Sequence, residues 1–209
     1  MSAEPIGPEA AVWQPDPVRQ ALANYTLQDL LNLPPDAPRV ELVDGVIHVV
    51  PSANTGHQTI ATMLCNWFYA HAPEEFFAYQ DVGVALGPGH TRQPDVLVCY
   101  DDVVGDNEHY VLPADVVLAV EVVSPSTKTT DRFAKPGEYA AAGIPCYWRI
   151  ERDPLHVFAY QLREPTRPSG LREYELVADS DTLIKVEQPF PIEFPLSEIV
   201  RRPRPRPRR

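Results

Sequence analysis

The sequence predicts an α/β (α+β) fold in which helices flank a central mixed β-sheet. Apolar residues recur at helical spacing between residues 60 and 68. Residues 116–123, by contrast, are apolar except for one glutamate, which is typical of a strand covered on both faces. The predicted order is hairpin, helix, three strands, helix and strand. This order suits a mixed sheet rather than a doubly wound nucleotide-binding fold.

The N-terminal part of the chain predicts a short helix and a hairpin. Residues 1–24 are rich in proline and weakly patterned, so we expect a flexible segment with little fixed structure. Thr26 precedes an apolar run and predicts the cap of a short helix that ends before Pro34. Residues 39–50 form two β-patterned runs around an Asp-Gly pair, which favours a tight hairpin turn.

Two longer helices and a series of strands are predicted beyond the hairpin. One helix starts near Gly56, and a second lies within residues 131–142 and ends at Gly143, a residue suited to a helix C-cap. Residues 83–89 contain three glycines but no phosphate-loop lysine, so we expect a loop there. Strands are predicted at residues 76–86, 94–100, 116–123, 146–151, 155–162 and 171–178, with the last two as an antiparallel extension.

Length and composition favour one domain with separate ends. The 209 residues are 44% hydrophobic, enough for one substantial core, and we assign residues 25–200 to this domain. The last nine residues, RRPRPRPRR, hold six of the 18 lysines and arginines. Alternating Arg and Pro predicts a disordered tail at residues 201–209. It is either simply solvated or a nonspecific phosphate-binding arm.

The charge and the cysteines exclude several classes of protein. A net charge of −11 argues against nonspecific coating of nucleic acid, because phosphate neutralisation needs a positive surface. Without the tail, residues 1–200 carry 12 − 29 = −17 charges. No signal-peptide pattern or membrane-spanning apolar run is present, so we expect a cytoplasmic protein. Cys65, Cys99 and Cys146 have no zinc-site spacing and are expected to be buried small side chains.

Two acidic residues stand where a structural role explains them poorly. Glu121 lies within the apolar run 116–123, where an ionised carboxylate costs several kcal/mol unless it is compensated. Asp95 begins another apolar strand, although an aspartate after proline is also common in turns. If the two strands are neighbours, both carboxylates can bind one cation, with the backbone carbonyl of Val122 as a third ligand. Oxygen ligands of this kind favour Mg²⁺ or Mn²⁺.

A positive side chain would complete such a site by orienting water and offsetting negative charge. Lys128 and Lys135 are both in range, and we favour Lys135 as the catalytic lysine. Asp131 and Tyr139 lie one helical turn before and after it and are placed to hold its ammonium group. Pro136 suggests that Lys135 caps a helix that starts at the proline. The alternative is an exposed Asp131–Lys135 salt bridge.

Two further residues are weaker candidates for catalysis. Glu41 lies in the predicted hairpin, where a surface role is the alternative. His57 lies at the start of the buried face of its predicted helix. Its role there is that of a core histidine, of a group that orients a ligand, or of a proton carrier. The polar residues of 124–127 are expected to form caps and turns, because no nucleophile elbow surrounds them.

Several short segments occur together in a recognisable order. They are YTLQDL at 25–30, ELVDG at 41–45, HQ at 57–58, QPDVLV at 93–98, VEVVSPST at 120–127, Asp131 with Lys135, and YAAAGIPCYWRIE at 139–151. By these segments, residues 25–198 resemble the Uma-type family of restriction-endonuclease-like proteins, a branch of the PD-(D/E)XK nuclease superfamily. The resemblance implies that Asp95 and Glu121 are metal ligands and that helix-borne Lys135 replaces the lysine expected at Val123. It also supports a role for Glu41, although the chain has Val46 where many members have a further acid.

These residues favour a magnesium- or manganese-dependent endonuclease that hydrolyses DNA phosphodiester bonds by in-line attack of water. A catalytically silent nuclease-fold module for binding or regulation is the alternative, since the acidic composition is unfavourable for DNA. A hydrolase of another phosphate ester is compatible with the same residues. DNA is the expected partner, no membrane is expected, and a homodimer is expected because two sites are needed to cut two strands.

Overall fold

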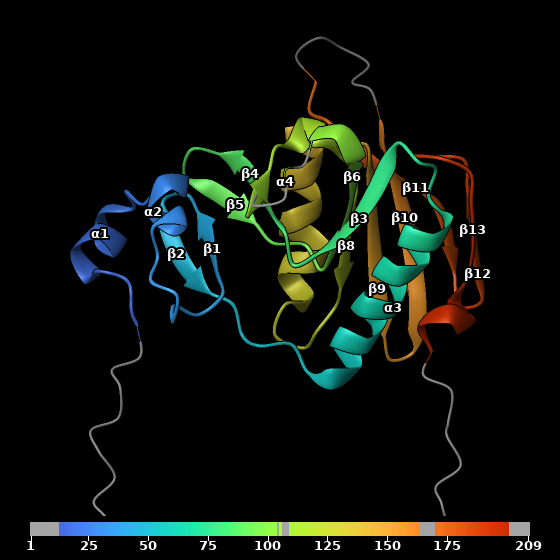
Figure 1. Ribbon diagram of the computed structural model, residues 1–209, viewed down its shortest axis with the longest axis horizontal. Coiled ribbons are helices and arrows are strands. Elements are labelled where there is room, and N and C mark those ends of the chain that lie inside the picture. Colours follow the sequence, from blue (N-terminus) through green and yellow to red (C-terminus); the bar gives the residue numbers. More distant parts are fainter. Residues whose placement is uncertain (1–12, 104, 106–108, 164–169, 201–209) are drawn as a thin grey trace, which may run out of the picture. The chain divides into compact units, whose positions relative to one another are not determined.

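A computed structural model describes residues 13–103, 105, 109–163 and 170–200 (Figure 1). The predicted disordered tail, and the first half of the predicted flexible N-terminus, lie outside the described residues. The chain divides into two compact units, which are described separately: one comprises Met1–Ser52 and Pro88–His90, and the other Ala53–Gly87 and Thr91–Arg209. No described helix is long and apolar enough to cross a membrane.

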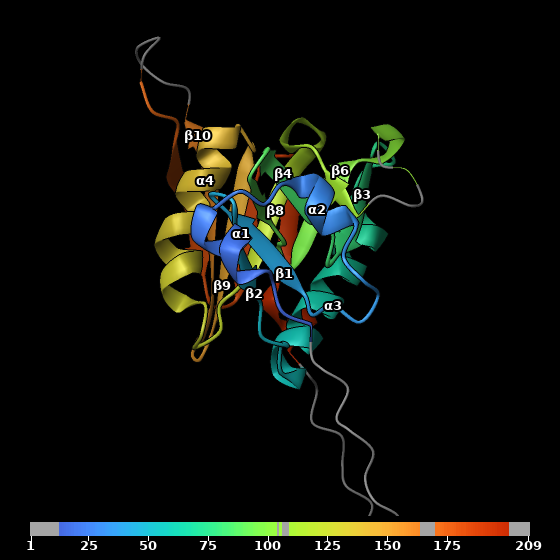
Figure 2. The same cartoon turned by 90° about the vertical axis from the view of Figure 1, so that its left-hand side faces the viewer.

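The smaller unit contains two short helices and a hairpin, visible in Figure 2. The first helix differs from our expectation of little fixed structure before residue 25. It forms because the Asp16 carboxylate accepts hydrogen bonds from the backbone N–H groups of Val18 and Arg19, with Pro17 in the first turn. The elements are α1 (Pro17–Leu22), α2 (Leu27–Leu31), β1 (Val40–Val43) and β2 (Val46–Val49).

The predicted hairpin is confirmed, with β1 and β2 antiparallel and Glu41 opposite His48. Asp44 and Gly45 adopt positive φ angles of 50° and 77°, as a tight turn requires. A side chain at Gly45 would also collide with the carbonyl oxygen of Ala23. Glycine is therefore needed both for the turn and for the close approach of the backbone.

The larger unit is built on a six-stranded mixed sheet with the order β11-β10-β9-β8-β6-β3. Strands β8 and β9 are parallel, and the other neighbouring pairs are antiparallel. This confirms the predicted central mixed sheet and its C-terminal antiparallel extension. The strands are β3 (Phe76–Gln80), β6 (Val96–Tyr100), β8 (Val116–Val122), β9 (Cys146–Arg152), β10 (Leu155–Arg163) and β11 (Glu173–Ser180).

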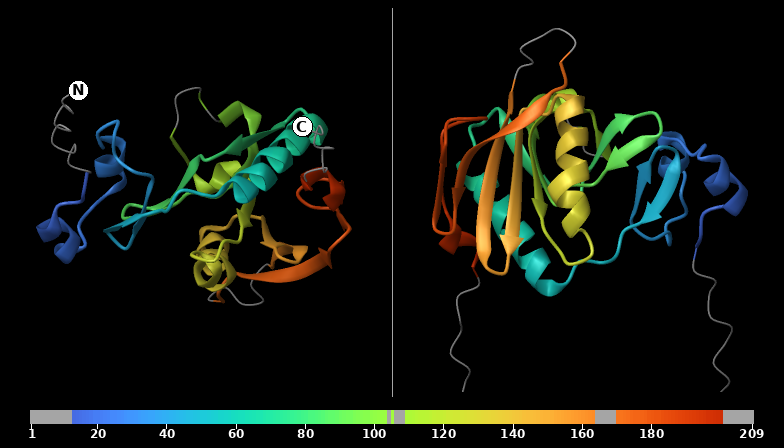
Figure 3. Two further views of the ribbon diagram at one scale, coloured as in Figure 1. Left: turned by 90° about the horizontal axis from the view of Figure 1, so that it is seen from below. Right: turned by 180° about the vertical axis from the view of Figure 1, so that it is seen from behind.

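Two helices cover opposite faces of this sheet (Figure 3). Helix α3 (Thr55–His71) packs Leu64 and Phe68 against one face, in a core that includes Val120. Helix α4 (Lys135–Ala142) packs Tyr139 against the other face, in a core that includes Ala119. Alternate residues of a strand point to opposite faces, so β8 is apolar along its length except at Glu121. All seven of its residues are buried.

Several elements differ from the predictions. The predicted strand 76–86 is divided at Asp81, which has a φ of 59°, into β3 and β4 (Gly83–Gly87). The predicted loop at 83–89 is therefore wrong, because β4 pairs in parallel with β7 (Tyr110–Val111). The unpredicted elements are β5 (His90–Arg92), the hairpin β12 (Leu183–Val186) and β13 (Ile192–Pro195), and the short helical turns η1 (Asp101–Val103), η2 (Pro113–Asp115) and η4 (Leu196–Ile199).

The cysteines agree in part with the prediction of buried side chains. Cys99 and Cys146 are buried, whereas Cys65 is only partly buried. Burial raises the pKa of both Cys99 and Cys146 to about 12, with a further contribution from Asp115 at Cys99. Their thiols are therefore small core side chains and not thiolate nucleophiles.

Candidate active site

The two predicted acids lie on neighbouring parts of the sheet. Strands β6 and β8 pair antiparallel, with Val96 facing Val120. Asp95 directly precedes β6, and its N–H donates a 3.1 Å hydrogen bond to the carbonyl of Val120, the residue before Glu121. The two strands at which the acids lie are therefore sheet neighbours, as the predicted cation site requires.

Glu121 binds two groups of α4. Its Oε2 atom lies 2.8 Å from the Nζ atom of Lys135, and its Oε1 atom accepts a 2.7 Å hydrogen bond from the Tyr139 hydroxyl. Glu121 is only 2% exposed and Lys135 only 5% exposed. The lysine that we favoured therefore does meet the strand acid, from the helix and across 14 residues of sequence.

The local helix geometry that brings Lys135 to the sheet differs from the prediction. Helix α4 begins at Lys135 itself, and a π-helical turn, η3 (Thr130–Ala134), leads directly into it. Lys135 is therefore not the N-cap, a position taken by Ala134 in helical conformation. Pro136 has no backbone N–H to donate. This absence is tolerated after a π turn, because the hydrogen bonds of the turn already depart from the α-helical pattern.

Asp131 belongs to the same buried group. Its Oδ1 atom lies 3.2 Å from the Nζ atom of Lys135, and the two side chains are 1% and 6% exposed. The alternative of an exposed salt bridge is therefore wrong. The hydroxyl of Tyr147 donates a 2.7 Å hydrogen bond to the backbone carbonyl of Asp131, which fixes the π turn to β9.

Asp95 is held by α3 and by β8. Its Oδ1 atom lies 2.8 Å from Nε2 of His57, and its Oδ2 atom accepts a 2.7 Å hydrogen bond from the N–H of Val122. Both Asp95 and His57 are 7% exposed. Nδ1 of His57 is buried and has no hydrogen-bond partner among the described residues. His57 is therefore positioned to orient Asp95, which is one of the roles left open above.

A comparison with protein families agrees with this architecture. The family model Uma2, described as "Putative restriction endonuclease", matches residues 27–197. The chain belongs to the Uma2 family. The crystal structure of "a putative nuclease belonging to DUF820 from Anabaena variabilis ATCC 29413" has a TM-score of 0.62 and 21% identity, and the match covers 83% of this chain and 96% of that one. This likeness supports the fold. No curated protein matches the chain.

The electrostatics of this Uma2 chain are dominated by buried negative charge. Burial raises the pKa of Glu121 well above its usual value; Lys135 lowers it, and the neighbouring carboxylates of Asp131 and Asp95 raise it again. Burial likewise raises the pKa of Asp131, against the opposing effect of Lys135. The buried lysine balances only one charge when these acids are all ionised. A further cation would stabilise the ionised carboxylates.

The oxygen atoms suit a hard divalent cation, within limits. Among the described residues, no group of three or more His, Cys, Asp and Glu side chains is arranged to hold a metal ion. Mg²⁺ nevertheless needs only one or two carboxylates, because it keeps several waters or substrate oxygens. Asp95 and Glu121 meet this requirement, and each of their oxygens has a second lone pair to offer. The role of the Val122 carbonyl stays a prediction.

The other predicted residues lie apart from this buried group. Glu41 is on β1 in the smaller unit, so its part in the site stays a prediction. Lys128 is exposed and contacts neither strand acid within the described structure. Ser124 and Thr127 form the expected turn, in which the N–H of Thr127 donates to Ser124 and their hydroxyls are 2.8 Å apart.

Sequence reasoning missed part of the network that surrounds Glu121. Tyr139 was expected to hold Lys135, and the hydrogen bond from its hydroxyl to Glu121 was not predicted. Tyr147 was not identified at all, although a tyrosine in a strand covered on both faces needs a partner for its hydroxyl. That requirement is the signal that could have indicated it.

Proposed function

We propose that this chain is a magnesium-dependent endonuclease that hydrolyses phosphodiester bonds in DNA. One observation carries the proposal. Asp95 directly precedes β6 and accepts a hydrogen bond from the N–H of Val122, next to Glu121 on the neighbouring strand β8, and the ammonium group of Lys135 lies 2.8 Å from Glu121. Two acids and a lysine at a sheet end are the groups that phosphodiester hydrolysis needs for cation binding and water positioning.

Asp95 and Glu121 would hold the divalent cation, in agreement with their oxygen chemistry and with the excess of buried negative charge around Lys135. A bound cation of this kind supplies positive charge next to the phosphate oxygens. The raised pKa of Glu121 supports this assignment, because the carboxylate has too little compensating charge from the protein alone.

The remaining groups act through hydrogen bonds and proton positions. Lys135 can donate to an attacking water while it also holds Glu121, since an ammonium group has three donors. The Tyr139 hydroxyl restrains Glu121 by its bond to Oε1. Nε2 of His57 and the N–H of Val122 hold the two oxygens of Asp95 and so fix the orientation of this carboxylate. In-line attack then requires the phosphate to lie beside these groups.

The test is cleavage of supercoiled plasmid and of single-stranded DNA with magnesium, manganese or EDTA. Asp95→Asn and Lys135→Met should each abolish cleavage while the protein remains folded. Glu193→Gln is the matched control, because Glu193 is exposed and paired only with Lys185 among the described residues. Cleavage in EDTA, or full activity in Asp95→Asn, would contradict the proposal.

A catalytically silent binding module is the second candidate, and one observation favours it. The protein itself already satisfies the acids: Lys135 and Tyr139 bind Glu121, while His57 and the Val122 N–H bind Asp95. Magnesium titration separates the two candidates, since an ion at 100 times its Kd stabilises the folded state by about 2.7 kcal/mol. If magnesium stabilises the protein but no DNA is cleaved, the binding module is favoured. If magnesium neither stabilises the protein nor supports cleavage, the metal site is excluded.

A homodimer is the assembly that we propose for cleavage of duplex DNA. One site cuts one strand, so a double-strand break by a single complex needs two copies related by a twofold axis. Sedimentation at working concentration gives the mass, and the plasmid assay gives the product. A monomer that only nicks the plasmid would contradict the dimer but not the hydrolysis.

A further inference from the structure

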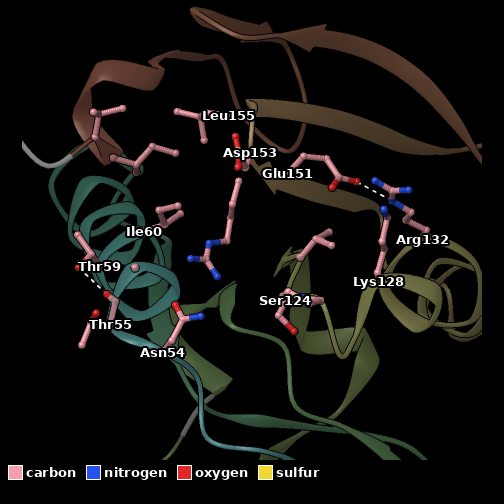
Figure 4. A pocket seen from close by; sticks show the side chains of 16 residues that line it. Asn54, Thr55, Thr59, Ile60, Ser124, Lys128, Arg132, Glu151, Asp153 and Leu155 are labelled. Atoms are coloured by element: carbon pink, nitrogen blue, oxygen red, sulfur yellow. Dashed lines mark hydrogen bonds and ion pairs between the residues drawn. The ribbon is translucent and has the colours of Figure 1, made fainter.

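An open cavity of about 750 Å³ is shown in Figure 4. It is lined by the first turns of α3, the loop after β8, the turn between β9 and β10, and the end of η4. Two of its lining residues, Gly56 and Val123, are the immediate sequence neighbours of His57 and Val122. Whatever occupies the cavity therefore lies next to the groups that hold Asp95.

Three positively charged side chains line the cavity: Lys128, Arg132 and Arg152. Arg132 is paired, with Nε 2.8 Å from Oε1 of Glu151, an interaction visible in Figure 4. Lys128 and Arg152 have no hydrogen bond or ion pair within the described structure. The exposed Asp153 also lines the cavity, so its walls carry three positive and two negative charges. This positive balance contrasts with the net charge of −11 for the whole chain.

The position of Arg152 is unfavourable without an anion. A Cβ added at Gly56, in the first turn of α3, would lie 2.8 Å from Nη2 of Arg152. The guanidinium group is therefore in contact with the N-terminal turn of a 17-residue helix, the end that carries positive partial charge. A cation at this end repels the helix dipole, whereas an anion beside both groups would be attracted by both.

Part of the cavity lining is apolar. Ile60 on α3, Leu155 on β10 and Ile199 on η4 contribute to it, and Figure 4 shows Ile60 and Leu155 directed into the space. A ligand that combines a negative charge with a less polar ring fits both kinds of lining. One nucleotide has this composition, with a phosphate on one side and a sugar and base on the other.

We propose that this cavity binds one nucleotide of a DNA strand adjacent to the bond that is cut. Its phosphate lies between Lys128 and Arg152, and its sugar and base lie on Ile60 and Leu155. The choice of DNA as the ligand rests on the proposed function. The cavity adds a strand-positioning site that is separate from the buried acids, and the unpaired side chains of Lys128 and Arg152 bind the phosphate.

The test is binding of a short fluorescein-labelled single-stranded DNA oligonucleotide in EDTA, measured by fluorescence anisotropy over a range of salt. Lys128→Ala and Arg152→Ala should each weaken binding about tenfold, because each removes a charged hydrogen-bond donor to phosphate. Each should also lower the salt slope by about one unit. The matched controls are Lys185→Ala and Arg163→Ala, which remove exposed cations paired with Glu193 and Glu175.

The outcomes separate this proposal from the nuclease proposal. Unchanged affinity and salt slope in both cavity variants would overturn the strand site, even if wild-type protein cuts DNA. Weakened binding in both variants would support it, even if no cleavage is observed and the nuclease proposal fails. Absence of oligonucleotide binding by the wild-type chain would overturn it as well. Lys128 is exposed, so its variant should fold and carries the same prediction if Arg152→Ala is unstable.

Competition by deoxyadenosine monophosphate distinguishes a strand from a free nucleotide. A strand makes further contacts beyond one nucleotide, so the monophosphate should displace the probe only at a concentration far above that of unlabelled oligonucleotide. Equal competition by the two would overturn the assignment to a strand.

Discussion

Substitution of Glu121 by glutamine should change the pH dependence of stability in a defined direction. The pKa of Glu121 is raised in the folded protein, chiefly by burial. Below the unfolded pKa of about 4.3, the carboxyl is protonated in both states. Above it, the folded state keeps a proton that the unfolded state releases. The stabilising contribution is therefore complete at low pH and is lost as the pH rises through the raised folded pKa.

The magnitude follows from this one proton. In the window between the two pKa values, the free energy of unfolding falls by up to about 1.4 kcal/mol per pH unit. About 1 kcal/mol shifts Tm by 2–4 °C in a domain of this size, so the wild type should lose about 3–5 °C per pH unit relative to the variant. In Glu121→Gln the part of the loss that comes from Glu121 disappears, and the part that comes from the raised pKa of Asp131 remains.

The assay is thermal unfolding in EDTA across the weakly acidic to neutral range for wild type and Glu121→Gln. Glu193→Gln, an exposed control, should follow the wild-type curve. A constant offset between wild type and Glu121→Gln reflects lost hydrogen bonds, whereas a change in slope reflects the pKa. Parallel curves throughout this range would refute the reasoning. Added magnesium should flatten the wild-type curve alone if the cation binds ionised Glu121.

Three further substitutions test the network and the fold. Lys135→Met should lower the free energy of unfolding by about 3 kcal/mol at pH 8, because the buried carboxylates lose their cation, and by less at pH 5. Equal losses at both pH values, measured by denaturant unfolding, would contradict this. Tyr139→Phe should cost about 1–2 kcal/mol and raise the pKa of Glu121 further, seen as an extended pH-dependent loss of Tm. Gly143→Ala should lower the free energy of unfolding by about 1 kcal/mol, because Gly143 caps α4 with a left-handed φ of 87° that alanine adopts only with strain. An unchanged Tm would argue against this role as a helix cap.

Much of the candidate site could be predicted because its residues conflict with their local surroundings. Glu121 interrupts a continuous apolar run, and a buried carboxylate requires a partner wherever the strand is placed. The hairpin at Asp44 and Gly45 follows from the φ angles that its turn requires. Lys135 was favoured over Lys128 as the lysine of the site, and the structure brings its Nζ atom to 2.8 Å from Glu121.

Other features could not be predicted because their cause lies in a distant part of the chain. The segment from Gly83 contains glycines typical of a loop, yet it is a strand because Tyr110 and Val111 offer it a parallel partner. The hydroxyl of Tyr139 binds Glu121 only because α4 lies on that face of the sheet. Sequence spacing carries no information about such packing.

The sequence by itself determined the hairpin, the two longer helices, most strands of the central sheet and the burial of Glu121, because apolar periodicity and the cost of burying charge act locally. Only the tertiary structure decided which groups compensate those acids and where unpaired cations gather. Asp131 is buried because the π turn carries it toward the sheet, and Arg152 meets Gly56 because β9 ends beside α3. Contacts of this kind depend on packing between segments far apart in the chain, and the net charge of those segments does not reveal them.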